Sequence, residues 1–240
     1  MLFPLLLGSN AGGLAGSEND AKIWGDIFST YSKLYPKDYE TPVILTGTLT
    51  RAKIAHAVKL IHEKCKPGDI LFFFYSGHGY TRGSVDLEEK GADEYIPLSD
   101  GPLLDHELVP LLKHPTVKMQ YVCTLDCCHS GGFDDILRAQ SNDWLLIASC
   151  AEHQLAQESF VRTKELGWPP GPSVVCGAFT GNFRQALLHI SQQVNKETVS
   201  IQDMECHTHK DDVWELMKWM NQEYVIRGNK NISLFKDLIP

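Results

Sequence analysis

The chain has 240 residues, of which 43% are hydrophobic and 22% charged, a composition typical of one soluble globular domain. Its net charge of −8 disfavours nucleic acid or an anionic membrane as the main partner, because either would repel the average surface. No apolar run reaches the roughly 18 residues of a membrane span, and the apolar start LFPLLLG lacks the basic flank of a secretory leader. Seven cysteines, an odd number, indicate free thiols in a reducing, cytoplasmic compartment.

Short apolar runs rich in β-branched and aromatic residues alternate with amphipathic patterns along the chain. We interpret the runs as strands buried on both faces, at residues 3–8, 42–47, 69–77, 119–126 and 143–150. The amphipathic patterns predict helices at residues 18–34, 50–65, 104–112, 177–192 and 211–225. This alternation predicts an α/β fold with a mostly parallel central sheet flanked by helices on both faces.

Two segments are predicted as long loops. Residues 80–100 are acidic and contain glycine, and residues 157–173 hold the sequence VRTKELGWPPGP. We expect one domain over residues 1–240, in which the second loop separates a larger part, about residues 1–156, from a smaller part, about residues 174–240.

The sequence TLDCCHSGG, residues 124–132, directly follows a predicted strand. Zinc ligation would need a second ligand pair of matching spacing, and the isolated segment ECHTH at residues 205–209 is a poor candidate. A redox pair is disfavoured because vicinal cysteines form only a strained disulfide. We interpret Cys123 and Cys127 as small buried hydrophobic residues, and Cys128 as a candidate nucleophile.

A candidate base for this thiol lies 50 residues earlier, at the end of another strand. His78 stands between Gly77 and Gly79, where the backbone can approach a ligand closely. An imidazole there can take the thiol proton and pass it to a leaving amine. A histidine buried in the core is the alternative. Because both motifs follow strands of a parallel sheet, we expect them at the same edge of that sheet.

The motifs FYSGHG and LDCCHSGG together resemble the metacaspases, a family of caspase-like cysteine peptidases. The segments LLLGSNAGGLAGSENDAKIWGDIF, GADEYIPLSDGPLLDHEL, LLIASCAEHQLAQE and GAFTGNFRQAL are also similar to the family, so the resemblance covers most of the chain. It implies a caspase-like fold and an endopeptidase that forms an acyl-enzyme, with Cys128 as nucleophile and His78 as general base and acid. The backbone amides of Gly79 and Cys128 would stabilise the oxyanion.

The resemblance also implies a substrate pocket for arginine or lysine. Asp126, two residues before Cys128, would repel an acidic side chain and favour a basic one. This charge disfavours the alternative of a caspase proper, which cuts after aspartate. Similarity to metacaspases adds Asp20 and Ser76 as further walls of the pocket. The alternatives are a helix N-terminal acid for Asp20 and a solvated strand-end acid for Asp126.

Calcium is the activator that the resemblance implies, and no organic cofactor is expected. Hard carboxylates suit this ion, although solvated surface acids without a metal are the other interpretation. The family often has paired acids where this chain reads Asp105-His106, so Asp134 or Glu107 are alternative ligands. The positions that the resemblance assigns to calcium are Asp93, Asp105 and Asp135.

Arg162 and Lys164, in the second predicted loop, are candidate sites of self-cleavage, and an uncut linker is the alternative. We expect a monomer that acts on peptides or proteins with exposed arginine or lysine, without a nucleic-acid or membrane partner. The rival from another class is a catalytically silent caspase-like scaffold that binds peptides without cutting them.

Overall fold

The computed structural model of this chain describes residues 1–83, 92–134, 143–193, 198–200 and 222–236. A six-stranded sheet at its centre has the order β12-β8-β7-β3-β1-β2. Five of its strands are mutually parallel, namely β1 (Leu2–Gly8), β2 (Val43–Thr46), β3 (Ile70–Ser76), β7 (Gln120–Asp126) and β8 (Trp144–Ala148). The sixth, β12 (Val225–Gly228), pairs antiparallel with β8. The predicted α/β class and mostly parallel sheet are confirmed.

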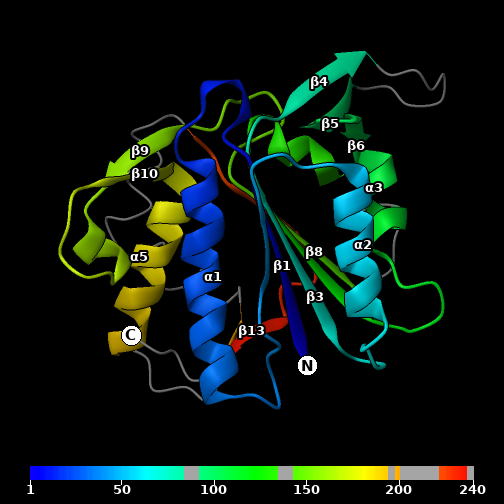
Figure 1. The fold of residues 1–240 in the computed structure, drawn as a ribbon, viewed down its shortest axis with the longest axis horizontal. Helices are drawn as coiled ribbons and strands as arrows, with labels where there is room; N and C mark the ends of the chain where they lie inside the picture. Colours follow the sequence, from blue (N-terminus) through cyan, green and yellow to red (C-terminus); the bar gives the residue numbers. More distant parts are fainter. Residues whose placement is uncertain (84–91, 135–142, 194–197, 201–221, 237–240) are drawn as a thin grey trace.

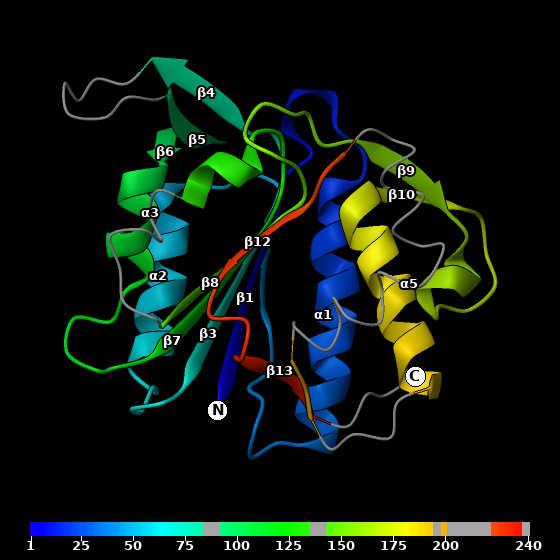
Figure 2. The ribbon, with the colours of Figure 1, turned by 180° about the vertical axis from the view of Figure 1, so that it is seen from behind.

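Helices cover both faces of this sheet, as Figures 1 and 2 show from opposite sides. The helices α1 (Ser17–Leu34) and α5 (Ala178–Gln193) lie on one face. The helices α2 (Arg51–His62) and α3 (Asp105–Leu112) lie on the other. None of the described helices combines the length and apolar character that a membrane crossing requires.

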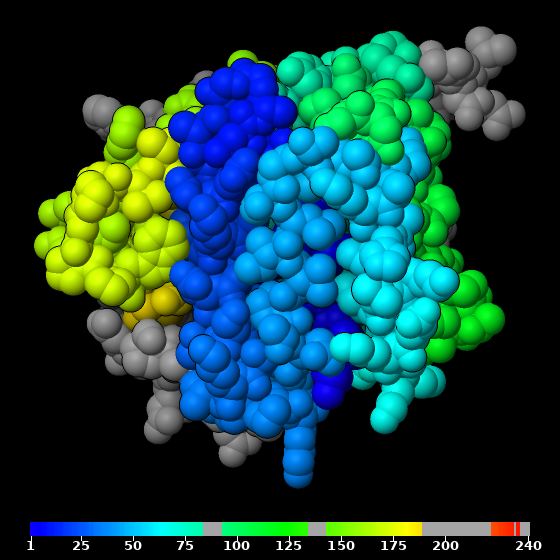
Figure 3. Space-filling view, viewed as in Figure 1, coloured from blue at the N-terminus to red at the C-terminus, as the bar shows by residue number. Residues whose placement is uncertain are grey.

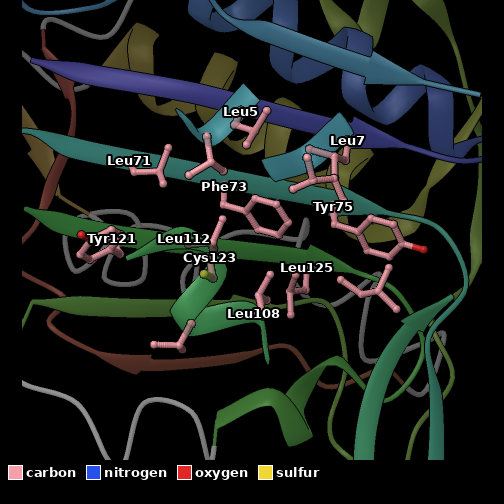
Figure 4. Close-up of a cluster of buried hydrophobic side chains, with 14 of the residues drawn as sticks. Leu5, Leu7, Leu71, Phe73, Tyr75, Leu108, Leu112, Tyr121, Cys123 and Leu125 are labelled. Carbon is pink, nitrogen blue, oxygen red and sulfur yellow. The ribbon is translucent and has the colours of Figure 1, made fainter. Parts of the chain in front are cut away.

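Alternation along the central strands builds two separate apolar cores, because successive side chains point to opposite faces. Under α1 the core is aromatic: Trp24 packs against Phe72, Phe74 and Phe183, with ring centroids 4.9–5.6 Å apart. The second core, under α2 and α3, contains Leu5, Leu7, Leu71, Phe73, Leu108 and Leu125 (Figure 4). These cores hold the central strands in place from both faces.

The predicted loop over residues 80–100 is wrong for most of its described residues, because 80–83 and 92–98 are strands of a three-stranded antiparallel sheet. Its strands are β4 (Tyr80–Gly83), β5 (Ala92–Leu98) and β6 (Gly101–Leu104). The predicted loop over residues 157–173 is only partly a loop, since it begins with β9 (Glu158–Val161) and contains the 3-10 turn η3 (Thr163–Leu166). Strand β9 pairs antiparallel with β10 (Val174–Gly177).

Two further predictions need correction or fall outside the described residues. Strand β2 is an edge strand with alternating exposure, not one buried on both faces, and its Ile44 is 42% exposed. Of the helix predicted at residues 211–225, residues 211–221 lie outside the described residues. Its predicted last residue, Val225, is the first residue of strand β12. Near the C-terminus, β11 (Thr198–Ser200) pairs with β13 (Ser233–Lys236). The division of the chain into two parts stays a prediction.

The carboxyl ends of β1 and β3 lie at the upper edge of the sheet in Figure 1. The start of α1, strand β4 and the β9–β10 hairpin gather at the same edge. The space-filling view shows this upper region as contiguous, with N-terminal residues between the β9–α5 side and the β4–β6 side (Figure 3). Segments distant in sequence therefore meet where a parallel sheet usually carries its functional loops.

Candidate active site

The register of two neighbouring strands brings the two sequence motifs together. Ser76 at the end of β3 pairs with Asp126 at the end of β7. His78 and Cys128 each follow these paired residues by two positions, so both leave the sheet at the same point. Any side chain at position 79 would collide with the carbonyl oxygen of Cys128. Glycine at this position therefore allows the two loops to touch, at the sheet edge where the sequence predicted both motifs.

The Cys128 thiol is half-buried, and its Sγ lies 3.9 Å from the carbonyl oxygen of Ala156. Burial raises the pKa of Cys128, so at neutral pH the resting group is a thiol that needs a base. Its neighbours Cys123 and Cys127 are 5% and 1% exposed, which confirms that they are buried. All six cysteines in the described part of the chain are free.

Three neighbours define the position of His78. The hydroxyl of Tyr75 donates a hydrogen bond of 2.8 Å to the backbone carbonyl of His78. In Figure 4 the Tyr75 ring lies at the end of the core, and its hydroxyl points away from it. The His78 Nε2 lies 3.5 Å from the carbonyl oxygen of Gly12, and Tyr80 stacks against the ring. A proton on Nε2, directed at Gly12, leaves Nδ1 as the nitrogen that can accept a proton.

The turn after Cys128 is fixed by His129, whose φ of 59° is the only positive value among the described non-glycine residues. Its backbone N–H donates to the carbonyl of Gln154 at 2.9 Å, and its Nδ1 lies 2.7 Å from the carbonyl of Glu152. These two contacts tie the turn to residues 152–154 and hold the carbonyl edge of that segment in place. His129 therefore has a structural place beside the thiol.

A buried side chain from the far end of the sequence holds the loop that faces Cys128. Gln222 is 2% exposed, accepts a 3.2 Å hydrogen bond from the Gln157 amide and donates a 2.8 Å bond to the Ser149 carbonyl. The loop between them carries Ala156, whose carbonyl faces the thiol. Sequence reasoning missed Gln222, because nothing in its local pattern marks it as part of this site.

The three residues predicted to line a basic-residue pocket do meet. The Ser76 hydroxyl donates a 2.7 Å hydrogen bond to Asp20, and the Gly177 amide donates a 2.8 Å bond to the same carboxylate. Gly177 also adjoins Asp126, and a side chain at this position would collide with the Asp126 carboxylate. Asp20 and Asp126 are 0% and 4% exposed, which excludes the alternative of a solvated strand-end acid for Asp126.

Asp126 is held by the start of α5. Its Oδ2 accepts hydrogen bonds from the Thr180 amide at 3.0 Å and the Thr180 hydroxyl at 2.7 Å. Burial raises the pKa of Asp126 to about 6, although the bonds from Thr180 act in the opposite direction. Burial also raises the pKa of Asp20 well above its ordinary value, and the nearby Asp126 charge raises it further. Ionisation of both carboxyl groups at once is therefore disfavoured.

Comparison with known proteins places this chain in a family. The model of the metacaspase, peptidase C14 domain matches residues 5–137, more than half of the chain. The chain belongs to the metacaspase family. Among its curated relatives, Metacaspase-3 of Trypanosoma cruzi is 28% identical over 186 residues, which are 66% of this chain and 49% of the relative. Metacaspase-1 of Saccharomyces cerevisiae is 32% identical over 136 residues, 51% of this chain and 31% of the relative.

Its fold also has a solved counterpart. Protein GSU0716 from Geobacter sulfurreducens superposes with a TM-score of 0.60 at 24% identity, covering 94% of this chain and 92% of the other. A likeness at that identity concerns the fold alone. This metacaspase chain spans about half or less of the length of the curated relatives named above.

Part of the metacaspase calcium prediction can be placed in the structure. Ligand atoms of Asp93, Asp105 and His106 lie within 4.8 Å of one another, and both aspartates are buried. Arg82 contacts the Asp93 carboxylate at 3.4 Å. Glu107 instead accepts 3.0 Å bonds from the Leu104 amide and from Arg51. Asp135 and the side chain of Asp134 lie outside the described residues.

The two predicted self-cleavage positions lie in the connection between β9 and β10. Arg162 has extended backbone angles, φ −68° and ψ 137°, and its exposed side chain pairs with Glu165. Lys164 is inside η3, and its carbonyl accepts a bond from the Gly167 amide. Glu158, at the start of β9, accepts 3.0 Å and 2.5 Å bonds from the Ala15 and Gly16 amides. The hairpin is thereby fastened to the start of α1.

Proposed function

We propose that this chain is a cysteine endopeptidase that cleaves peptide bonds after arginine or lysine. The observation that supports the proposal is the Ser76–Asp126 register. His78 and Cys128 each follow one member of this pair by two residues, and the carboxyl groups of Asp20 and Asp126 are buried at the same strand ends. A thiol and an imidazole supply the chemistry, and a buried negative charge supplies preference for a basic substrate side chain.

The reaction follows from these groups. His78 takes the Cys128 proton at Nδ1, and Sγ attacks the carbonyl carbon of the scissile bond. Amides of Gly79 and Cys128 stabilise the oxyanion while the carbon is tetrahedral. The C–N bond then breaks, and His78 returns the proton to the leaving amine. Water attacks the resulting thioester, giving a carboxylic acid and restoring the thiol.

Access to the pocket requires rearrangement at the start of α5. The two carboxyl groups are bonded to Gly177 and Thr180, so an entering arginine or lysine replaces those donors with its own charged N–H groups. A basic side chain gains a full charge interaction that an acidic or apolar one lacks, which favours cleavage after basic residues.

The test compares fluorogenic peptides that are identical except for arginine, lysine or aspartate before the scissile bond. We expect hydrolysis of the arginine and lysine peptides only. Hydrolysis of the aspartate peptide would support a caspase proper. Binding of the arginine peptide without its hydrolysis, with and without calcium, would support the rival function of a silent scaffold.

Calcium is proposed as the activator of this peptidase, through Asp93 and Asp105. Two buried carboxylates within reach of one cation are the donors that calcium prefers. The imidazole of His106 suits a transition metal better, so Asp93 and Asp105 are the residues assigned to calcium. When bound, the ion would supply charge that holds β5 and the start of α3 together. No organic cofactor is required by the proposed reaction.

The substitution Arg82→Gln should tighten calcium binding about tenfold, because the guanidinium occupies the Asp93 carboxylate and repels the incoming ion. Calorimetric titration of the purified protein with calcium measures the effect without any substrate. Arg51→Gln is the matched control, since Arg51 pairs with Glu107 rather than with Asp93. Equal affinities for Arg82→Gln and Arg51→Gln would show that Arg82 does not compete for the site.

Self-processing is proposed at Arg162. A protease binds its substrate in an extended conformation, which Arg162 already has and which Lys164, inside a 3-10 turn, does not. In the cell we propose a cytoplasmic monomer that acts on proteins with exposed arginine or lysine.

The substitution Arg162→Gln should slow self-cleavage about tenfold or more, whereas Lys164→Gln should change it less than twofold. Mass spectrometry of fragments after calcium addition gives both rates. The β9–β10 pairing should keep the two fragments together on a sizing column, because the hairpin strands remain hydrogen-bonded after the cut. A fragment ending at Lys164 whose yield is unaffected by Arg162→Gln would contradict the assignment.

A further inference from the structure

The His78 ring is one end of a column of three stacked rings. The centroids of His78 and Tyr80 are 5.6 Å apart with planes inclined by 29°. Tyr80 in turn stacks on Tyr95, with centroids 5.5 Å apart and planes inclined by 28°. We call His78, Tyr80 and Tyr95 the aromatic column. It occupies the boundary between the His78 motif and the small antiparallel sheet.

Strand pairing supports this arrangement. Tyr80 follows His78 by two residues and begins β4, and its ring stacks on the imidazole. Tyr80 and Tyr95 are register partners across β4 and β5. The β5–β6 hairpin is anchored by buried Ile96 and Leu103, so the far end of the column rests on a fixed support.

The other contacts of His78 leave its ring orientation weakly defined. The Tyr75 hydroxyl fixes the backbone carbonyl, but it does not touch the imidazole. The Gly12 carbonyl is 3.5 Å from Nε2, near the upper limit for a hydrogen bond. A ring stacked on the imidazole face restricts its rotation.

We propose that Tyr80 is a positioning residue for His78, acting through its aromatic face. This inference rests on the proposed function, in which His78 is the general base and acid. The hydroxyl of Tyr80 has no part in it, so phenylalanine should replace tyrosine. Because Tyr80 acts on the proton transfer by His78, its loss should lower kcat and leave KM nearly unchanged.

Three variants of the full chain separate positioning from simple cross-strand packing. Tyr80→Leu removes both the His78 stack and the Tyr80–Tyr95 pair, whereas Tyr95→Leu removes only the pair. Tyr80→Phe keeps both stacks. We expect Tyr80→Leu to lower kcat on the arginine peptide about tenfold with KM within twofold, and we expect the other two to remain within twofold of the wild type.

Two readouts do not depend on peptide hydrolysis, so they remain informative if the proposed activity fails. The imidazole protons of His78 should carry an upfield ring-current shift in NMR spectra, present in the wild type, Tyr80→Phe and Tyr95→Leu and lost in Tyr80→Leu. Alkylation of Cys128 by iodoacetamide at fixed pH should slow several-fold in Tyr80→Leu alone. Equal effects of Tyr80→Leu and Tyr95→Leu would overturn the inference, as would a wild-type His78 spectrum without the ring-current shift.

Discussion

Replacing Cys128 by alanine should lower hydrolysis of the arginine peptide by at least about 10⁴-fold, because the acyl-enzyme cannot form without the thiol. Its effect on folding should be small, since the side chain is only half-buried and the hydrogen bond of its Sγ to the Ala156 carbonyl is long, at 3.9 Å. The rate is measured with the fluorogenic peptide, and labelling with a chloromethyl ketone ending in arginine reports the thiol directly.

Cys127→Ala is the matched control, because Cys127 is the adjacent cysteine and is fully buried. Removing its sulfur from the core should cost about 1–2 kcal/mol of stability and lower the melting temperature. The chloromethyl ketone should still label this variant, on the Cys128 thiol. If Cys128→Ala retained the label and Cys127→Ala lost it, the nucleophile would be Cys127 and not Cys128.

Asp126→Asn should reduce kcat/KM for the arginine peptide on the order of 100-fold, because it removes the Asp126 carboxylate that attracts the basic side chain. A peptide with citrulline in place of arginine is the matched substrate, being nearly the same shape without the charge. Wild-type protein should strongly prefer arginine, and the variant should treat the two alike. An unchanged preference for arginine in Asp126→Asn would place the specificity pocket elsewhere.

The same substitution should stabilise the fold above pH 6. Burial raises the pKa of Asp126 from 3.8 to about 6, so the folded state binds a proton more tightly than the unfolded state. Stability from this group is complete below about pH 4 and is lost as the pH rises through about 6. Asparagine has no such loss, so Asp126→Asn should be about 1–3 kcal/mol more stable than wild type at pH 7 and equal or less stable at pH 4. Thermal melts at the two pH values test the sign.

The pH dependence of catalysis should follow from the same group. Below about pH 6 the Asp126 carboxyl is protonated, and the pocket loses its attraction for arginine. Wild-type preference for arginine over citrulline should therefore decline as the pH falls through about 6, while the preference of Asp126→Asn stays flat.

The sequence predicted the central sheet well, because short continuous apolar runs are typical of strands that are buried on both faces. The strand predicted at 119–126 differs from β7 by one residue, and the helix predicted at 18–34 differs from α1 by one. The small sheet was missed because β4 and β5 are rich in polar and charged residues. Asp93 and Glu94 look like surface acids in sequence, yet both are buried in β5.

The candidate site could be predicted where local sequence determines position. His78 and Cys128 follow strands whose register is fixed by the apolar pattern, and the structure does bring their loops together. Thr180 and Gln222 could not be predicted, because their contacts with Asp126 and with the loop beside Cys128 depend on packing between elements far apart in sequence. The contact between Tyr80 and His78 has one sign in the sequence, which is their spacing of two residues.

Strand β12 has a consequence for how copies of this protein meet. Without β12, the apolar strand β8 would be the edge strand of the sheet. Its unpaired backbone N–H and C=O groups could then pair with a strand of another copy. Four residues from the C-terminal part cover β8, and they end at Gly228, where a side chain would collide with the Trp144 carbonyl. A chain shortened before Val225 should lose this protective cover and aggregate edge to edge.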